Sequence, residues 1–327
     1  MGSIAEIKNL SLAFRTPEGP AEVIRDVSFE IQEGECVALV GESGCGKTTV
    51  AKAVMGLHND RTTIVKPGSR IEFGGRNILD FSKREWQEFR GKQVSMIFQD
   101  AMSSLNPTMR VGEQIAEAVF LHQKIEKKEA LRIATGLLEQ MGVANPDENA
   151  RRYPFEFSGG MRQRVMIAMA MACNPRLLIG DEPTTALDVT IQTQILQLIK
   201  DLQKKRGMAV LFVTHNFGIV AGLAQRVVVM YNGKIVEKGR TEEIFYRPLH
   251  PYTQALLRST LRMDTKKSRK DLYSIEGTPP GILHPPAGCP FAKRCSYAVA
   301  ECEHAFPPEH RETGTQTVYC WQYKKEE

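Results

Sequence analysis

The sequence lacks several features that would place it in a specialised class of protein. Its start, "MGSIAEIKNL", has no basic-then-apolar pattern of signal-peptide type. Apolar runs such as residues 165–173 fall far short of the ~20 residues that a membrane span needs. We find no internal repeat and no low-complexity tract. We therefore expect a cytosolic globular protein rather than a secreted, membrane-spanning or repeat protein.

A strong excess of one charge is also missing. The chain has 43 basic and 38 acidic residues, and a net charge of +5 is too small to predict binding to nucleic acid. Disulfides are rare in a reducing compartment. The seven cysteines are also an odd number, which fits poorly with a complete set of disulfides. The 327 residues predict roughly two domains with an ordinary soluble core.

The chain does contain the pattern of an α/β protein. Residues 4–40 alternate as strands do, a glycine-rich turn follows, and residues 47–57 have helical spacing. Residues 110–142 also read as helices. Three short apolar runs predict buried parallel strands, at 177–181, 208–215 and 226–233. Apolar strands that alternate with helices predict a mostly parallel sheet covered on both faces.

The composition changes after about residue 255. Residues 264–271, "DTKKSRKD", read as a charged linker, and residues 276–290 are rich in proline and glycine. We therefore predict a main domain over 1–255 and a C-terminal extension over 256–327.

The glycine-rich turn "GESGCGKT" at 41–48 has the form G-x-x-x-x-G-K-[ST] between a strand and a helix. Backbone N–H groups of such a loop surround phosphate, Lys47 reaches the β and γ phosphates, and Thr48 binds Mg²⁺. The alternative is a chance glycine turn. The residues predicted to bind nucleotide here are Gly41, Glu42, Ser43, Gly44, Cys45, Gly46, Lys47, Thr48 and Thr49.

The second half of such a site is an acidic residue at the end of an apolar strand. "LLIGDEP" at 177–183 supplies Asp181 to hold Mg²⁺ and Glu182 to accept a proton from the attacking water or orient it. The alternative is that these two acidic residues only form a solvated turn or the start of a helix. With the glycine loop, the pair predicts a magnesium-dependent nucleoside triphosphatase (NTPase) with a P-loop fold.

The stretch "FSGGMRQR" at 157–164 narrows the class, because it resembles the signature of the ATP-binding cassette family. Further matches occur in the family's order over about residues 4–255. Gln99 matches the Q-loop, Asp188 the D-loop and His215 the switch histidine, and Phe14 lies where the family often stacks an aromatic ring on adenine.

The resemblance implies a cassette with an antiparallel β subdomain and a helical subdomain at about 100–155. It implies that Glu182, His215 and Gln99 are catalytic, with Gln99 also at the metal. Ser158, Gly159 and Gly160 at a helix N-terminus would contact the γ-phosphate bound by a second, homologous or identical subunit. The chain departs from the family pattern at four positions, Phe14, Met161, Gly180 and Asn216.

The chain is most similar in motif to the ATPase subunits of oligopeptide, dipeptide and nickel import systems. "FQDAMSSLNP" at 98–107, "DEPTTALDVT" at 181–190, "HPYTQALL" at 250–257 and the cysteine-rich end carry this likeness. It implies a peripheral subunit on the cytoplasmic face of the membrane, with two permease subunits and an extracytoplasmic binding protein as partners. It implies no nucleic acid, and it leaves the cargo open among peptides, nickel, glutathione and opines.

Four cysteines lie close together near the C-terminus, at Cys289, Cys295, Cys302 and Cys320. Clustered thiols in a reducing compartment often bind metal. The resemblance implies a [4Fe–4S] cluster. Zn²⁺, with His304 or His310 as substitute ligands, and unligated structural thiols remain alternatives.

Two rival functions remain at this point. A soluble cassette ATPase acting on DNA or ribosomes tends to carry two cassettes or long coiled-coil insertions, and this chain has neither. A small-molecule kinase gives no reason for the 157–164 motif or for His215. The expected function is ATP hydrolysis that energises uptake of dipeptides, oligopeptides or related solutes through ATP-driven dimerisation of cassettes.

Overall fold

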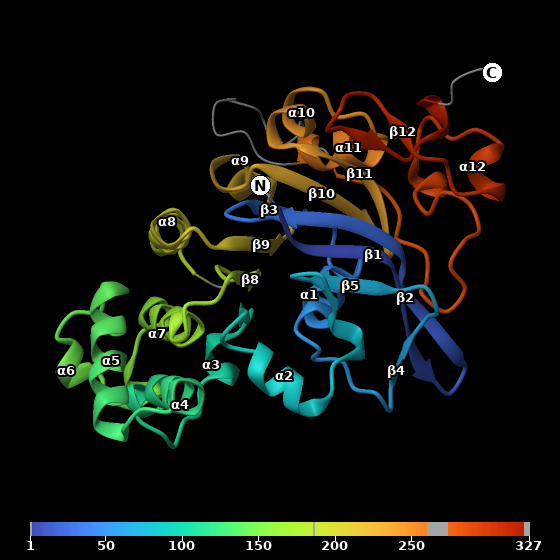
Figure 1. The fold of residues 1–327 in the computed structure, drawn as a ribbon. Helices are drawn as coiled ribbons and strands as arrows, with labels where there is room; N and C mark the ends of the chain where they lie inside the picture. The colour runs from blue at the N-terminus through green and yellow to red at the C-terminus, as the bar shows by residue number, and fades with distance from the viewer. Residues whose placement is uncertain (1, 186, 260–273, 324–327) are drawn as a thin grey trace. The chain divides into compact units, whose positions relative to one another are not determined.

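The computed structural model describes residues 2–185, 187–259 and 274–323 (Figure 1). It divides into two compact units. Unit 1 comprises Met1–Ile4, Gln32–Glu35 and Asp80–Phe212, and unit 2 comprises Ala5–Ile31, Cys36–Leu79 and Val213–Glu327. The expected charged linker at 264–271 lies outside the described residues.

Unit 1 combines a buried parallel strand pair with a group of helices. Strand β7 (Val94–Ile97) runs parallel to β8 (Leu177–Asp181), and every residue of both strands is buried. The helices are α2 (Lys83–Phe89), α3 (Ala101–Ser104), α4 (Val111–Gln123), α5 (Lys127–Gln140), α6 (Pro146–Asn149), α7 (Gly159–Met171) and α8 (Val189–Arg206). Helices α4 and α5 pack on each other and on α7, the helix that starts at the 157–164 motif.

Unit 2 contains an antiparallel sheet and part of a second, mixed sheet. In the first, the order is β2-β1-β5-β6, and β4 pairs with β1. Its strands are β1 (Ser3–Thr16), β2 (Gly19–Gln32), β4 (Thr63–Val65), β5 (Arg70–Phe73) and β6 (Arg76–Asn77). This sheet is the expected antiparallel β subdomain. Its long strands, β1 and β2, come from the alternating segment at the start of the chain, and its three short strands come from residues 63–77.

The mixed strands of unit 2 connect the phosphate loop to the C-terminal segment. Strand β3 (Cys36–Val40) is parallel to β10 (Arg226–Tyr231), and β11 (Lys234–Arg240) is antiparallel to both β10 and β13 (Thr317–Val318). At the edge of this sheet, the two-residue strand β12 (His310–Arg311) pairs antiparallel with β13. The helices here are α1 (Lys47–Val54), α9 (Phe217–Leu223), α10 (Thr241–Tyr246), α11 (Pro251–Ser259) and α12 (Glu301–His304).

The sequence predicted the long elements well. Strands β8 and β10 lie at 177–181 and 226–231, and β9 (Ala209–Thr214) lies within the third expected run. The sequence missed β7, β12 and β13, because strands of two to four residues are too short to show a period. No helix among the described residues is long and apolar enough to cross a membrane.

Gly180 lies in the buried strand β8, where the lack of a side chain usually weakens a strand. A Cβ atom at this position would lie 3.2 Å from Cγ of Pro183 and 3.5 Å from Cδ2 of Phe212. The glycine therefore lets the strand end pack closely against two neighbouring rings. This close packing gives the residue a structural reason.

Candidate functional site

The phosphate loop joins the buried strand β3 to helix α1 in unit 2. Gly41, Gly44 and Gly46 all have positive φ angles, of 155°, 80° and 105°. A Cβ at Gly41 would clash with the carbonyl oxygen of Met230, and a Cβ at Gly46 would lie 2.6 Å from Cδ1 of Ile24. The glycines are therefore needed both for backbone conformation and for space.

Lys47 is the buried cation of this loop, with 4% of its surface exposed. Its ammonium group donates to the carbonyl oxygens of Gly41 at 2.8 Å and Glu42 at 3.0 Å. The loop thus holds a positive charge at its centre next to the N-terminus of α1, an arrangement suited to phosphate. Burial raises the pKa of Cys45, so its thiol stays neutral, in accord with a role for its backbone alone.

Sequence reasoning missed two side chains that contact this loop. The hydroxyl of Tyr252 accepts a hydrogen bond from the Glu42 N–H at 2.8 Å, and Arg294 forms an ion pair with the Glu42 carboxylate at 2.8 Å. Tyr252 lies in the "HPYTQALL" stretch, which the sequence analysis used only as a family marker. A contact across 252 residues leaves no local signal that could reveal Arg294.

The acidic pair lies at the end of β8 in unit 1. Asp181 is 3% exposed, and Glu182 has a left-handed backbone with φ of 47°, which is uncommon outside glycine. The carboxylate of Glu182 accepts hydrogen bonds from Nε2 of Gln99 at 3.3 Å and from the Thr185 hydroxyl at 3.1 Å. The structure thus brings together the expected Q-loop glutamine and the expected catalytic carboxylate.

The 157–164 motif forms the start of α7, as expected. The Ser158 side chain is exposed and accepts a hydrogen bond from the Met161 N–H at 3.4 Å, so it caps the helix. A Cβ at Gly160 would lie only 2.7 Å from Cγ2 of Ile191, whereas one at Gly159 would meet Cδ2 of Leu187 at 3.6 Å. Gly160 therefore also serves the close approach of α7 to α8.

The remaining expected residues are spread over both units. Asp188 caps α8 by accepting from the Ile191 N–H at 3.0 Å in unit 1. In unit 2, His215 is exposed, and the following Asn216 caps α9 by accepting from the Gly218 N–H at 2.9 Å. Phe14 is 36% exposed on β1. Unit 2 therefore holds the phosphate loop, Phe14 and His215, and unit 1 holds the other residues that are expected to act on ATP.

The expected iron–sulfur cluster is wrong, and so is its zinc alternative. Cys289, Cys295, Cys302 and Cys320 all line one small cavity of about 10 Å³. Yet no group of three or more His, Cys, Asp or Glu in the described parts of the chain is placed to hold a metal ion. Burial raises the pKa of Cys289 to about 12 and that of Cys320 to about 11. All four are free thiols, and Cys289 and Cys302 are buried whereas Cys295 and Cys320 are half-buried.

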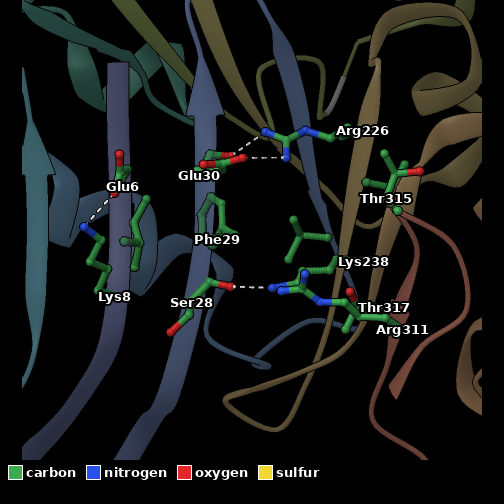
Figure 2. Close-up of a pocket in the computed structure, with 15 residues that line it drawn as sticks. Glu6, Lys8, Ser28, Phe29, Glu30, Arg226, Lys238, Arg311, Thr315 and Thr317 are labelled. Carbon is green, nitrogen blue, oxygen red and sulfur yellow. Dashed lines mark hydrogen bonds and ion pairs between the residues drawn. The ribbon is translucent and has the colours of Figure 1, made fainter. Parts of the chain in front are cut away.

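A separate cavity of about 450 Å³ lies in unit 2 (Figure 2). None of the residues predicted to bind ATP lines this cavity. Several of its charged groups are paired: Lys8 with Glu6 at 2.6 Å, and Arg226 with Glu30 at 3.6 Å. This cavity is therefore separate from the residues that are expected to bind ATP.

Comparison with known proteins identifies the family. The family model "ABC transporter" matches residues 24–185, and the model "Oligopeptide/dipeptide transporter, C-terminal region" matches residues 236–302. The dipeptide transport ATP-binding protein DppD of Bacillus subtilis (strain 168) is 45% identical over 98% of this chain and 95% of its own length. The oligopeptide transport ATP-binding protein OppD of the same organism is 49% identical over 97% of this chain and 88% of its own length.

Solved structures agree with this assignment. A dimeric ATP-binding cassette in a post-hydrolysis state, bound to ADP and Pi, matches with a TM-score of 0.65 and 25% identity. The match covers 72% of this chain and 98% of that cassette. With relatives of 44 to 49% identity over almost the whole chain, the chain belongs to the ATP-binding cassette transporter family and is an ATPase subunit of its oligopeptide and dipeptide branch.

Proposed function

We propose that this ATPase energises the import of dipeptides, oligopeptides or chemically related solutes. The match of residues 236–302 to the C-terminal region of oligopeptide and dipeptide transporters carries the proposal, because the ATPase core alone does not distinguish cargo classes. Three relatives that match nearly the whole chain are named dipeptide or oligopeptide transport ATP-binding proteins. Their names support the same cargo.

Within the site, we propose that the phosphate loop at 41–49 binds the ATP phosphates through its N–H groups and Lys47. Thr48, Asp181 and Gln99 would hold Mg²⁺, which neutralises charge on the phosphates. The buried position of Asp181 and the polar contacts of Glu182 support these roles. Glu182 would orient the attacking water and accept its proton, His215 would contact the γ-phosphate, and Phe14 would stack on the adenine ring.

We further propose that ATP closes two cassettes into a dimer, formed with an identical or homologous subunit. Ser158, Gly159 and Gly160 of one chain, together with Asp188, would then contact the nucleotide on the other. Support comes from the exposed Ser158 at the N-terminus of α7 and from two solved structures of one similar cassette, both of which are dimeric. Helix N-termini favour anions, so this end of α7 suits a γ-phosphate.

The proposed assembly adds two permease subunits in the membrane and an extracytoplasmic solute-binding protein, with the chain at the cytoplasmic face. Residues 1–255 would form the ATPase domain, with a helical subdomain at about 100–155 that meets the permeases, and 256–327 the C-terminal extension. The names of the relatives, which are transport ATP-binding proteins for dipeptides and oligopeptides, support a place for this chain in a membrane transporter.

Uptake by whole cells tests the proposal. Cells that lack this chain and carry the rest of its transporter receive the wild-type chain, Lys47→Ala or Glu182→Gln. We expect labelled dipeptide uptake with the wild-type chain only, and no restoration of ⁶³Ni²⁺ uptake. Restoration of nickel uptake without peptide uptake would reject the cargo. Uptake with Lys47→Ala at the wild-type rate would reject the proposed site.

A further inference from the structure

One guanidinium group of the C-terminal segment contacts the phosphate loop directly. Arg294 lies in a short 3₁₀ turn, Ala292–Arg294, next to Cys295. Its Nη1 lies 2.8 Å from Oε2 of Glu42, and its Nη2 lies 3.1 Å from Oε1 of the same carboxylate. The side chain of Arg294 is 6% exposed and that of Glu42 is 24% exposed. This two-point ion pair is therefore largely shielded from water.

Every N–H of this guanidinium has an acceptor. Besides the two Glu42 contacts, Nε donates to the Glu276 carbonyl at 2.8 Å, Nη2 to the Ile275 carbonyl at 3.1 Å, and Nη1 to the Tyr231 hydroxyl at 2.9 Å. Arginine has five donors in a fixed plane, and here all five are used. Arg294 thus has no donor left for a phosphate, and any effect on ATP must act through Glu42.

Glu42 is the second residue of the phosphate loop. Other side chains contact its carboxylate, its backbone N–H and its carbonyl oxygen. Arg294 holds the carboxylate, the Tyr252 hydroxyl accepts from the N–H, and the carbonyl oxygen accepts from Lys47 at 3.0 Å. Without Arg294, a carboxylate in a partly buried position would lie beside a cradle for a polyanion. It would repel the phosphates and offer Lys47 a rival partner.

The base of this contact is a packed aromatic cluster. Phe291, three residues before Arg294, is 2% exposed. The centroid of its ring lies 5.3 Å from that of Tyr231 and 5.3 Å from that of Tyr252. Tyr231 and Tyr252 meet each other at 4.6 Å. Both tyrosines also hydrogen-bond to the loop or to Arg294, so the C-terminal segment, α11 and the loop form one continuous packed contact within unit 2.

We propose that Arg294 is a positioning residue for ATP binding: it neutralises Glu42 and fixes the phosphate loop in a conformation that accepts the triphosphate. The inference rests on the proposed role of residues 41–49 as the ATP loop. It gives the C-terminal extension a part in nucleotide affinity. Loss of this contact raises the KM for ATP and leaves kcat little changed, because Glu182 and its contacts lie elsewhere in the chain.

A double-mutant cycle on the full chain tests this inference. The variants are Arg294→Met, Glu42→Gln and the double variant, and the readouts are Kd for Mg-ATP by calorimetry, steady-state kinetics, and Tm. We expect Arg294→Met to weaken ATP binding about tenfold, and Glu42→Gln to change it by no more than about threefold. The double variant should bind ATP within about threefold of Glu42→Gln, since the unpaired charge is gone.

Gln316→Leu is the matched control for a loosened C-terminal segment. Gln316 is 1% exposed and donates to Glu237 at 3.0 Å and to the Arg247 carbonyl at 2.9 Å, so it attaches the segment without touching the loop. We expect this variant to lower Tm with Kd unchanged. An equal loss of ATP affinity in Gln316→Leu, or no rescue by Glu42→Gln, would overturn the inference in favour of a purely structural contact.

If Arg294→Met does not fold, Arg294→Lys replaces it in the binding measurements. It keeps a positive charge but cannot contact five acceptors, and we expect about a threefold rise in Kd. Wild-type affinity in both Arg294 variants would overturn the inference alone. If the wild-type chain binds ATP no better than Lys47→Ala does, the proposed site fails, and this inference fails with it.

Discussion

In unit 2, side chains 210 and 252 residues away in sequence hold the phosphate loop, whereas in unit 1 the two helix-capping motif residues, Ser158 and Asp188, contact near neighbours. Tyr252 and Arg294 fix Glu42, but Ser158 and Asp188 each accept a hydrogen bond from an N–H three residues further on. The first arrangement needs the folded C-terminal segment. The second forms wherever its helix forms, so the loop should be the more sensitive to changes elsewhere in the chain.

The largest effect is expected at Glu182, which has one near contact, Thr185, and one distant contact, Gln99. Glu182→Gln keeps the size of the side chain but removes the base, so turnover should fall about 100- to 10,000-fold with ATP still bound. Phosphate release and ATP binding measure the two quantities. Glu88→Gln, at a 67% exposed side chain on α2, is the matched control. Normal turnover by Glu182→Gln would mean that another group activates the water.

The next effect separates the two regions by their glycines. Gly41→Ala places a methyl group against the Met230 carbonyl and 2.8 Å from Sγ of Cys45, so it should lower the free energy of unfolding by about 2 to 4 kcal/mol. Gly159→Ala meets only Leu187, at 3.6 Å, and should change it by no more than about 1 kcal/mol. Urea unfolding of both variants makes the comparison. Equal losses would contradict the difference between loop and helix start.

A smaller effect is expected at the cap of α8. Asp188→Ala leaves the Ile191 N–H without its side-chain acceptor and should lower the free energy of unfolding by about 1 kcal/mol. Asp201→Ala, which removes an exposed contact with Gln197 on the same helix, should cost about 0.5 kcal/mol or less. Thermal unfolding measures both. A larger loss of unfolding free energy in Asp201→Ala than in Asp188→Ala would contradict the stabilising role of the Asp188 cap.

The smallest effect concerns Asn216, where the family pattern has aspartate. Both side chains can accept the Gly218 N–H, so Asn216→Asp should leave the free energy of unfolding within about 0.5 kcal/mol of the wild type. Asn216→Ala should lose about 1 kcal/mol and serves as the reference. If the aspartate and alanine variants lost the same amount, this position would not act as a cap.

Tail cysteines show where sequence reasoning failed. The clustering of the thiols and the family resemblance both favoured a metal, and the four residues do line one cavity. In the described parts of the chain, however, no three His, Cys, Asp or Glu side chains are placed to hold a metal ion, and such placement cannot be read from the spacing of cysteines. The error therefore came from a tertiary property and not from a missed motif.

The sequence by itself determined the long elements, the glycine loop between β3 and α1, the capped start of α7 and the acidic end of β8. Each depends on neighbours in sequence, through periodicity, positive φ or a cap, so a short window contains the whole cause. Only the tertiary structure decided that Arg294 and Tyr252 hold Glu42, that Gly180 makes room for Pro183, and that the four tail cysteines are not placed to hold a metal ion. Those outcomes depend on packing between segments far apart in the chain, which no local pattern specifies.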